Sequence, residues 1–374
     1  MKFATKLFVK LEIYYQFTKK FFRKNKYFIP TFHFKKPKKN KVLIYNIKSK
    51  KFAEILFKKK NLTYYYADFR NLNLYIFFYT IKNSGLKNFK KNYKFNFFNS
   101  VKPKIIYTAM DNYLEFYLLK KIYPYATYIS DQNAMRDEKF FETCKKFKNK
   151  NNLFNDLFFC FGENQKARLK EIFKSKYYIT GNTINNNFKI KNSKSKIKKI
   201  IYISSGKYLD KELIPDINIF SSLKRFCDEK SLDLFFLDKP NRNRRKFFIK
   251  YFNYNLNYIS SQDILQNYNL MKKDTLFVFT ISTLGYEILS KGIRCVSLHH
   301  NQFNHRIKPY KNKGPFWIDT PDFNYNYNLI KNFLNSVLNY DQTKWNKIYK
   351  KFSKEILFYD QGNAIKKKII KKYL

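Results

Sequence analysis

Short apolar runs alternate with helical patterns along the first half of the chain. The runs lie at residues 42–45, 62–66, 105–108, 126–129 and 157–160. They have the length and continuous hydrophobicity of strands that are buried on both faces. Between them, stretches such as residues 72–83 carry apolar side chains at helical spacing. This alternation predicts a parallel sheet with helices on both faces.

The same alternation restarts in the second half, after a polar, lysine-rich stretch at residues 189–199. Strand-like runs lie at 200–203, 234–237, 276–279 and 295–298, with helical patterns near 208–230 and 283–291. We predict an α/β protein with two consecutive Rossmann-like, doubly wound parallel-sheet domains. Residues 41–190 form the first domain and 198–374 the second, and residues 1–40 are a basic, aromatic lead-in of irregular or helical structure.

Composition adds a large positive charge. The chain has 374 residues, 44% of them hydrophobic, and a formal charge of +49. Two readings relate this charge to function, as attraction to nucleic acid or to an anionic membrane surface. A third is drift of the genome toward AT-rich codons, which favours Lys, Asn, Ile, Phe and Tyr at any exposed position. Arg, the preferred reader of bases and phosphates, is scarce, so nucleic acid is the least favoured partner.

Cellular location is predicted from three further features. The four cysteines are far apart without metal-ligand spacing, as expected of free thiols in a reducing compartment. Lysines interrupt every apolar run near the N-terminus, and the longest run, residues 74–79, is too short to cross a bilayer. We therefore expect a cytoplasmic protein that can rest on the inner face of the cytoplasmic membrane through basic and aromatic residues.

Several common sites have no counterpart in the sequence. There is no GxGxxG, no GxxxxGK[ST], no Asp-x-Asp pair and no HExxH among the 374 residues. Dinucleotide, P-loop, metal–diphosphate and zinc-helix chemistry are therefore not predicted. We expect neither a cofactor nor a metal site.

The most informative segment reads LFVFTISTLGYE, from residue 276 to 287. A buried strand runs through a hydroxyl-bearing bend at Ser282 and Thr283 into a helix. Free N–H groups and the positive end of the helix dipole make such a bend an anion site. Gly285 would allow a close approach, and Glu287 would accept hydrogen bonds from sugar hydroxyls. The alternative is an ordinary capped helix with Gly285 at a packing contact.

Two further strand ends carry candidate chemistry. His299 and His300 follow the run at 295–298, where histidine can bind phosphate or transfer a proton. Exposed loop histidines are the alternative. Asp111 follows the run at 105–108 and is either a general base or the N-cap of the next helix. Gln132 and Asn133 follow the run at 126–129 and could contact a substrate. Gly162, Gly181, Asn182 and Trp317 are interpreted as turn or core residues.

At these positions the sequence resembles a family of bacterial surface carbohydrate biosynthesis proteins of lipopolysaccharide and capsule gene clusters, related to GT-B glycosyltransferases. The matching blocks lie at 102–112, 129–137 (ISDQNAMRD), 156–162, 181–187 (GNTINNN), 201–205, 282–287 (STLGYE) with Gly292, and 314–317 (GPFW). Where the family has Gln-Asn-Gly, this chain has Ala134 in place of the glycine.

The resemblance implies a GT-B-like enzyme in which two domains face a cleft. It places the acceptor in residues 41–190 and a nucleotide-sugar donor in 198–374, with a final helix near 363–374 crossing back. Ser282 and Thr283 would hold the donor diphosphate and Glu287 its hydroxyls. Lysines or His299 and His300 would offset the leaving-group charge in place of a metal, and Asp111 would deprotonate a saccharide or lipid-linked acceptor.

Two other functions fit the same sequence. One is a CDP-polyol phosphotransferase of cell-surface polymer synthesis, which would share the architecture and the hydroxyl-bearing bend. The other is a non-catalytic, membrane-associated adaptor that uses the basic surface alone.

Overall fold

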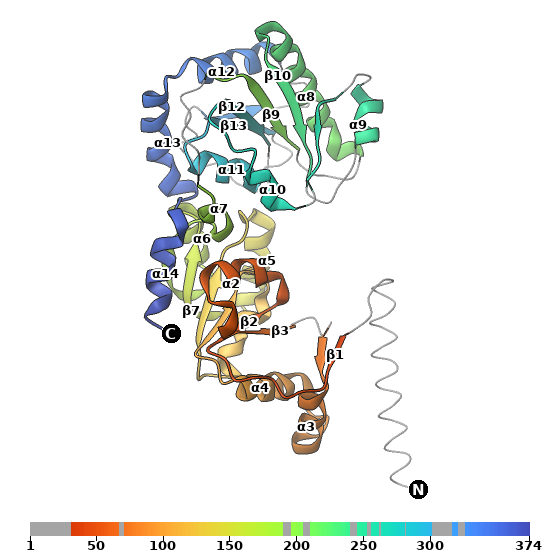
Figure 1. The fold of residues 1–374 in the computed structure, drawn as a ribbon, viewed down its shortest axis with the longest axis vertical. Coiled ribbons are helices and arrows are strands. Elements are labelled where there is room, and N and C mark those ends of the chain that lie inside the picture. The colour runs from red at the N-terminus through yellow and green to blue at the C-terminus, as the bar shows by residue number, and fades with distance from the viewer. Residues whose placement is uncertain are drawn as a thin grey trace.

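Two six-stranded sheets, each entirely parallel, organise the chain in the computed structural model (Figure 1). The structure describes residues 31–66, 71–189, 196–204, 210–239, 245–252, 256–261, 263–280, 282–300, 316–320 and 326–374. The first sheet has the strand order β3-β2-β5-β6-β7-β8 and the second β11-β10-β9-β12-β13-β14. Each sheet continues outward in both directions from a central strand, which is the doubly wound topology predicted from the sequence.

The first sheet comprises β2 (Val42–Tyr45), β3 (Leu62–Tyr65), β5 (Ile105–Thr108), β6 (Thr127–Asp131), β7 (Phe154–Cys160) and β8 (Lys174–Ile179). Its helices are α2 (Lys50–Leu56), α3 (Leu74–Ser84), α4 (Phe89–Val101), α5 (Glu138–Lys148), α6 (Glu163–Lys170) and α7 (Thr183–Asn187). The 3-10 helices within the described residues are η1 (Ile47–Ser49), η2 (Lys59–Asn61), η3 (Leu114–Lys121) and η6 (Gln361–Asn363). Part of the predicted lead-in is a short strand, β1 (Thr31–His33), which pairs with β4 (Asn71–Asn73) outside the main sheet.

The second sheet comprises β9 (Lys199–Ile203), β10 (Asp233–Leu237), β11 (Tyr258–Ile259), β12 (Thr275–Phe279), β13 (Cys295–His300) and β14 (Trp317–Thr320). Its helices are α8 (Asp210–Lys230), α9 (Arg245–Phe252), α10 (Ile264–Tyr268), α11 (Thr283–Ser290) and α12 (Tyr327–Asn339). Two more helices, α13 (Gln342–Ile356) and α14 (Ala364–Lys371), end the chain. Figure 1 shows α13 running down the side of the second domain and α14 lying beside β7 and α6 of the first.

All nine strands predicted from apolar runs are present, within a few residues of the predicted bounds. In β2, β5 and β12 every residue is buried, because these inner strands are covered on both faces. The strands that the pattern missed in these sheets, β8, β11 and β14, all lie at sheet edges. Edge strand β8 reads KSKYYI and is partly exposed, so it lacks a continuous apolar run.

The buried core is continuous from one domain to the other. One cluster of buried residues contains the side chains of both sheets together with Met135, Ile184, Leu357 and Ile370. A second cluster fills the other face of the first sheet, under α4, α5 and η3. Among the described residues no helix has both the length and the hydrophobicity needed to cross a membrane.

Candidate functional site

The carboxyl ends of strands from both sheets meet where the two domains touch. The backbone N–H of Met135, just after β6, donates to Thr283 Oγ1 at the start of α11 over 3.3 Å. Asn185 Nδ2 of α7 donates to Ser290 Oγ at the end of α11 over 3.1 Å. In open α/β sheets this edge is where ligands bind. The structure thus brings together the predicted segments around residues 132–133 and 282–287.

The bend between β12 and α11 leaves its polar groups poorly satisfied. Ser282 is the N-cap residue of α11, with extended φ and ψ of −85° and 130°, yet its side chain makes no capping hydrogen bond. Thr280 is fully buried, and its Oγ1 has no hydrogen-bond partner. Buried hydroxyls are normally paired. The first-turn amides, the helix dipole and these hydroxyls together form a site suited to an anion.

Gly285 serves packing, as the alternative interpretation held. A Cβ at this position would lie 2.3 Å from ring atoms of Phe279 in β12. The glycine therefore lets α11 lie directly on the sheet, and its place in a substrate site stays a prediction. By bringing the helix this close, Gly285 fixes where the N-terminus of α11 points.

Glu287 lies deep in the domain contact. It is 3% exposed, and its Oε2 accepts a hydrogen bond from Tyr268 Oη over 2.7 Å. Tyr268 stacks on Phe188 of the first domain with ring centroids 4.6 Å apart. Burial raises the pKa of Glu287 to about 7, against the lowering effects of the Tyr268 hydrogen bond and the charge of Lys291. A sugar hydroxyl would reach Glu287 only by replacing Tyr268, so its role in binding stays a prediction.

Replacing Glu287 by glutamine is expected to flatten the dependence of stability on pH. A carboxyl whose pKa is raised in the folded state stabilises the fold below about 4.5, and this contribution is lost as the pH rises through about 7. Relative to the wild type, Glu287→Gln should therefore gain up to roughly 3 kcal/mol between pH 5 and 8. Urea unfolding across this range measures the effect.

The exposed Glu142→Gln on α5 is the matched control and should follow the wild-type curve. Burial also lowers the pKa of Lys291, to about 8, so that group begins to lose its charge near the upper limit of this range, and the effect of Glu287 is read from the part of the curves below pH 7. Parallel curves for Glu287→Gln and the wild type would contradict the assignment.

Asp111 is held in a buried ion pair. Its carboxylate is fully buried and accepts from Arg136 through both oxygens, over 2.8 Å from Nε to Oδ2 and also from Nη2 to Oδ1. Arg136 Nη2 also donates to Asn133 Oδ1 over 2.6 Å. Asp111 does not cap the next helix, because η3 begins after Tyr113. With its lone pairs engaged, Asp111 is better suited to position Arg136 and Asn133 than to accept a proton.

Gln132 joins strand ends within the first domain. Its Oε1 accepts from the Phe161 N–H over 2.9 Å, and its Nε2 donates to Gln165 Oε1 over 2.9 Å and to the Ala134 carbonyl over 3.0 Å. These bonds use the amide fully, which favours a positioning role over substrate contact. Ala134, where the family resemblance expects glycine, has no positive φ, so its backbone needs no glycine.

His299 and His300 are the last residues of β13, which extends two residues beyond its predicted end. They pair with Asp319 and Thr320 of β14. Their side chains lie outside the described part of the structure, so their predicted roles stay predictions. Trp317 is buried in the core at the start of β14, as its core interpretation expected. In the part of the chain that the structure describes, no group of three or more His, Cys, Asp or Glu side chains gathers as a metal site.

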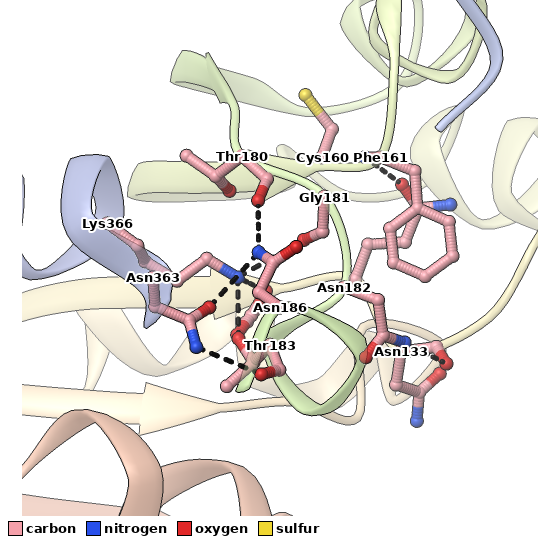
Figure 2. Close-up of polar contacts among 12 residues, drawn as sticks. Asn133, Cys160, Phe161, Thr180, Gly181, Asn182, Thr183, Asn186, Asn363 and Lys366 are labelled. Carbon is pink, nitrogen blue, oxygen red and sulfur yellow. Dashed lines mark hydrogen bonds and ion pairs between the residues drawn. The ribbon is translucent and has the colours of Figure 1, made fainter. Parts of the chain in front are cut away.

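A buried lysine that the sequence analysis missed ties the end of the chain to the first domain. Lys366 of α14 is fully buried, and its Nζ donates to Thr183 Oγ1 over 2.5 Å and to the Gly181 carbonyl over 3.2 Å (Figure 2). The same Nζ donates to Asp131 Oδ1 over 2.8 Å. Asp131 Oδ2 accepts from Tyr107 Oη over 2.8 Å and from Thr183 over 2.6 Å. The signal in the sequence was the placement of Lys366 on the same helix face as the buried Ile369 and Ile370.

Amides of the GNTINNN block continue this network. Asn186 Nδ2 donates to the Thr180 carbonyl over 2.7 Å and to Asn363 Oδ1 over 3.1 Å, and Asn363 Nδ2 donates to the Thr183 carbonyl over 3.0 Å (Figure 2). Asn186 Oδ1 accepts from the Asp360 N–H over 3.0 Å. Asn186 of the block therefore fixes the returning chain at the base of the domain contact, which is a structural role.

Comparison with known proteins supports this architecture. Residues 208–374 match the model of a family described as "putative O-antigen biosynthesis protein", so the predicted resemblance to surface carbohydrate biosynthesis proteins is confirmed over this part of the chain. No curated protein matches the chain.

Three solved structures cover the chain almost completely. A "putative UDP-N-acetylglucosamine 2-epimerase from Listeria monocytogenes" has a TM-score of 0.55 at 12% identity, covering 89% of this chain and 97% of its own. A UDP-N-acetylglucosamine 2-epimerase has a TM-score of 0.51 at 13% identity, with 90% and 95% covered. The S. aureus MnaA structure with UDP has a TM-score of 0.50 at 14% identity, with 90% and 96% covered. At these identities the likeness shows the fold alone, which is GT-B-like, with two Rossmann-like domains facing each other.

Proposed function

We propose that the chain is a nucleotide-sugar glycosyltransferase that binds its donor diphosphate at the N-terminus of α11. The observation that carries this proposal is the β12–α11 bend at the domain contact, where Ser282 makes no capping bond and the buried Thr280 hydroxyl has no partner. A diphosphate would supply acceptors for both hydroxyls and for the first-turn amides. Its charge would also be stabilised by the positive end of the helix dipole.

The family described as O-antigen biosynthesis proteins, matched over residues 208–374, supports transfer toward a surface polysaccharide such as lipopolysaccharide or capsule. The UDP named in the S. aureus MnaA structure supports a nucleotide as part of the donor. We propose the first domain as the acceptor side, because Asn133 and Arg136 lie beside the bond from Met135 to Thr283. A saccharide or lipid-linked acceptor would enter there, and cationic side chains, with His299 and His300, would offset the leaving-group charge.

Removing the hydroxyls of the bend tests the donor site. Ser282→Ala and Thr280→Val are each expected to weaken donor binding about 10- to 100-fold, because a hydrogen bond to a charged group contributes about 1.5–3 kcal/mol. Neither change should lower the free energy of unfolding, because the Ser282 hydroxyl makes no capping hydrogen bond and the Thr280 hydroxyl has no hydrogen-bond partner. Calorimetry with UDP-, GDP-, CMP- and CDP-linked donors measures the binding.

The matched control is Asn326→Ala at the start of α12, where the side chain does cap its helix by accepting from the Asn328 N–H over 3.0 Å. This change should lower stability by about 1 kcal/mol and leave donor binding unchanged. Undiminished binding by both Ser282→Ala and Thr280→Val would reject the site.

Product analysis then separates the reactions that this site could serve. A sugar moved from the bound donor to a saccharide acceptor supports the glycosyltransferase. A transferred polyol phosphate from a CDP-linked donor would identify the alternative phosphotransferase. Conversion of the nucleotide-sugar without any acceptor would identify an epimerase, the activity named for two of the structures that share this fold.

A further inference from the structure

Aromatic side chains are exposed together at the end of the first domain farthest from the second. Figure 1 shows α3 projecting there, with β1 beside it. Of the eleven large hydrophobic side chains that are exposed in the described residues, seven belong to this end: Phe32, Phe34, Tyr75, Phe78, Tyr79, Leu86 and Phe95. We call these residues, which lie on or beside β1, α3 and α4, the aromatic face.

The aromatic face is a built feature of the fold. Asn73 caps α3 by accepting from the Ile76 N–H over 3.0 Å, and its Nδ2 donates to the Lys35 carbonyl over 2.9 Å, which ties the segment after β1 to this helix. Phe77 packs edge-on against Phe89, which holds α3 against α4. These contacts lie on the inner side of α3, so its outer side chains are left free for another surface: Phe78 is 62% exposed and Tyr79 48%.

The charge around this face is predominantly positive. Residues 71–101, which contain α3 and α4, include five lysines and no aspartate or glutamate. Two of these lysines, Lys90 and Lys94, pair with Glu115 of η3 over 2.8 and 2.9 Å. Lys82 on α3, Lys87 in the turn between the helices and Lys91 on α4 are exposed and make no ion pair with a described residue. Exposed aromatic side chains and lysines without an acidic partner therefore lie together at this end of the first domain.

We propose that the aromatic face docks the protein on the surface of an anionic membrane. Aromatic side chains that have apolar bodies and polar tips suit the boundary between headgroups and acyl chains, and lysines beside them suit anionic headgroups. With eleven residues, α3 is too short to span a bilayer and would lie in its surface. The docking places the first domain against the membrane and leaves the second directed away from it. This inference is independent of the donor site at α11.

Binding of the full chain to vesicles tests the proposal. The chain should bind vesicles of phosphatidylcholine with one quarter phosphatidylglycerol, bind phosphatidylcholine alone much more weakly, and lose affinity as salt rises. Phe34→Ser, Phe78→Ser and Tyr79→Ser combined should lower the partition coefficient about tenfold or more. All three side chains are exposed, so the variant should keep the wild-type thermal unfolding profile and donor binding.

Control variants distinguish binding through the aromatic face from nonspecific hydrophobic binding and from binding that depends only on net charge. Leu329→Ser and Ile365→Ser combined remove two hydrophobic side chains that are exposed elsewhere, and this variant should bind vesicles within about twofold of the wild type. Lys87→Gln with Lys91→Gln should weaken binding several-fold more than Lys347→Gln with Lys350→Gln, which removes the same charge from exposed positions on α13.

Three results would overturn the proposal. One is that the wild-type chain does not bind the anionic vesicles. A second is that the aromatic-face variants and their controls lose binding equally. The third is that the aromatic-face variant keeps vesicle binding but loses binding to duplex DNA, which would assign this surface to nucleic acid.

Discussion

Replacing Lys366 by methionine is expected to lower the free energy of unfolding of the first domain by about 3–5 kcal/mol. Lys366 and Asp131 are both fully buried, and their ion pair of 2.8 Å is reinforced by Thr183 and Tyr107. Methionine fills a similar volume but leaves the Asp131 carboxylate buried without its cation. Urea unfolding followed by circular dichroism measures the loss.

Lys367→Met is the matched control, because it removes the same group from the next, exposed position on α14. It should change stability by no more than about 0.5 kcal/mol. The double replacement Lys366→Met with Asp131→Asn should recover much of the loss, since it leaves no unpaired buried charge. If Lys366→Met proved as mild as Lys367→Met, the ion pair would not be what fastens α14 to the first domain.

Replacing Gly181 by alanine is expected to destabilise the protein by about 3 kcal/mol or more. The residue has a φ of +66°, and an added Cβ would lie 1.9 Å from the backbone oxygen of Phe358. The left-handed conformation alone costs an alanine about 1–2 kcal/mol, and overpacking adds about 1–3 kcal/mol. Phe358 cannot yield by changing its rotamer, because its backbone is tied to the Phe161 carbonyl by a hydrogen bond of 2.8 Å.

Gly362→Ala isolates the steric part of this effect. Gly362 has nearly the same φ, +68°, but nothing lies within 4 Å of its added Cβ. Its replacement should therefore show only the conformational cost, and the difference between the two variants in thermal or urea unfolding measures the contact with Phe358. Equal losses would mean that the returning chain is free to move away from Gly181.

The same contact explains Gly162, which the sequence analysis interpreted as a turn residue. A Cβ there would lie 2.4 Å from the Glu355 carbonyl oxygen, at the end of α13. Glycine is therefore required at both positions, because the chain returning from the second domain passes directly over them and leaves no room for a side chain. A glycine in a turn and a glycine under a crossing segment look the same in sequence, since the crossing segment lies more than 170 residues away.

In the candidate site, too, some features follow from local sequence patterns and others depend on contacts between distant residues. The run at 276–279 and the hydroxyls that follow it identified the β12–α11 bend, because a buried strand and a helix start are local patterns. Whether Asp111 and Glu287 are free to act depends on partners at distant positions. Asp111 pairs with Arg136, and Glu287 with Tyr268. Because both carboxylates already accept hydrogen bonds within the protein, neither is as available to a substrate as its position along the sequence had suggested.

By itself the sequence determined the two parallel sheets and their inner strands, because continuous burial on both faces requires unbroken apolar runs. It also located the bend between β12 and α11. The tertiary structure decided which polar groups face a ligand and which face the protein. It buried Lys366, one of several lysines of α14, against Asp131, which lies 235 residues earlier in the chain. Burial and pairing depend on contacts between residues far apart in sequence, and periodicity along one segment carries no record of them.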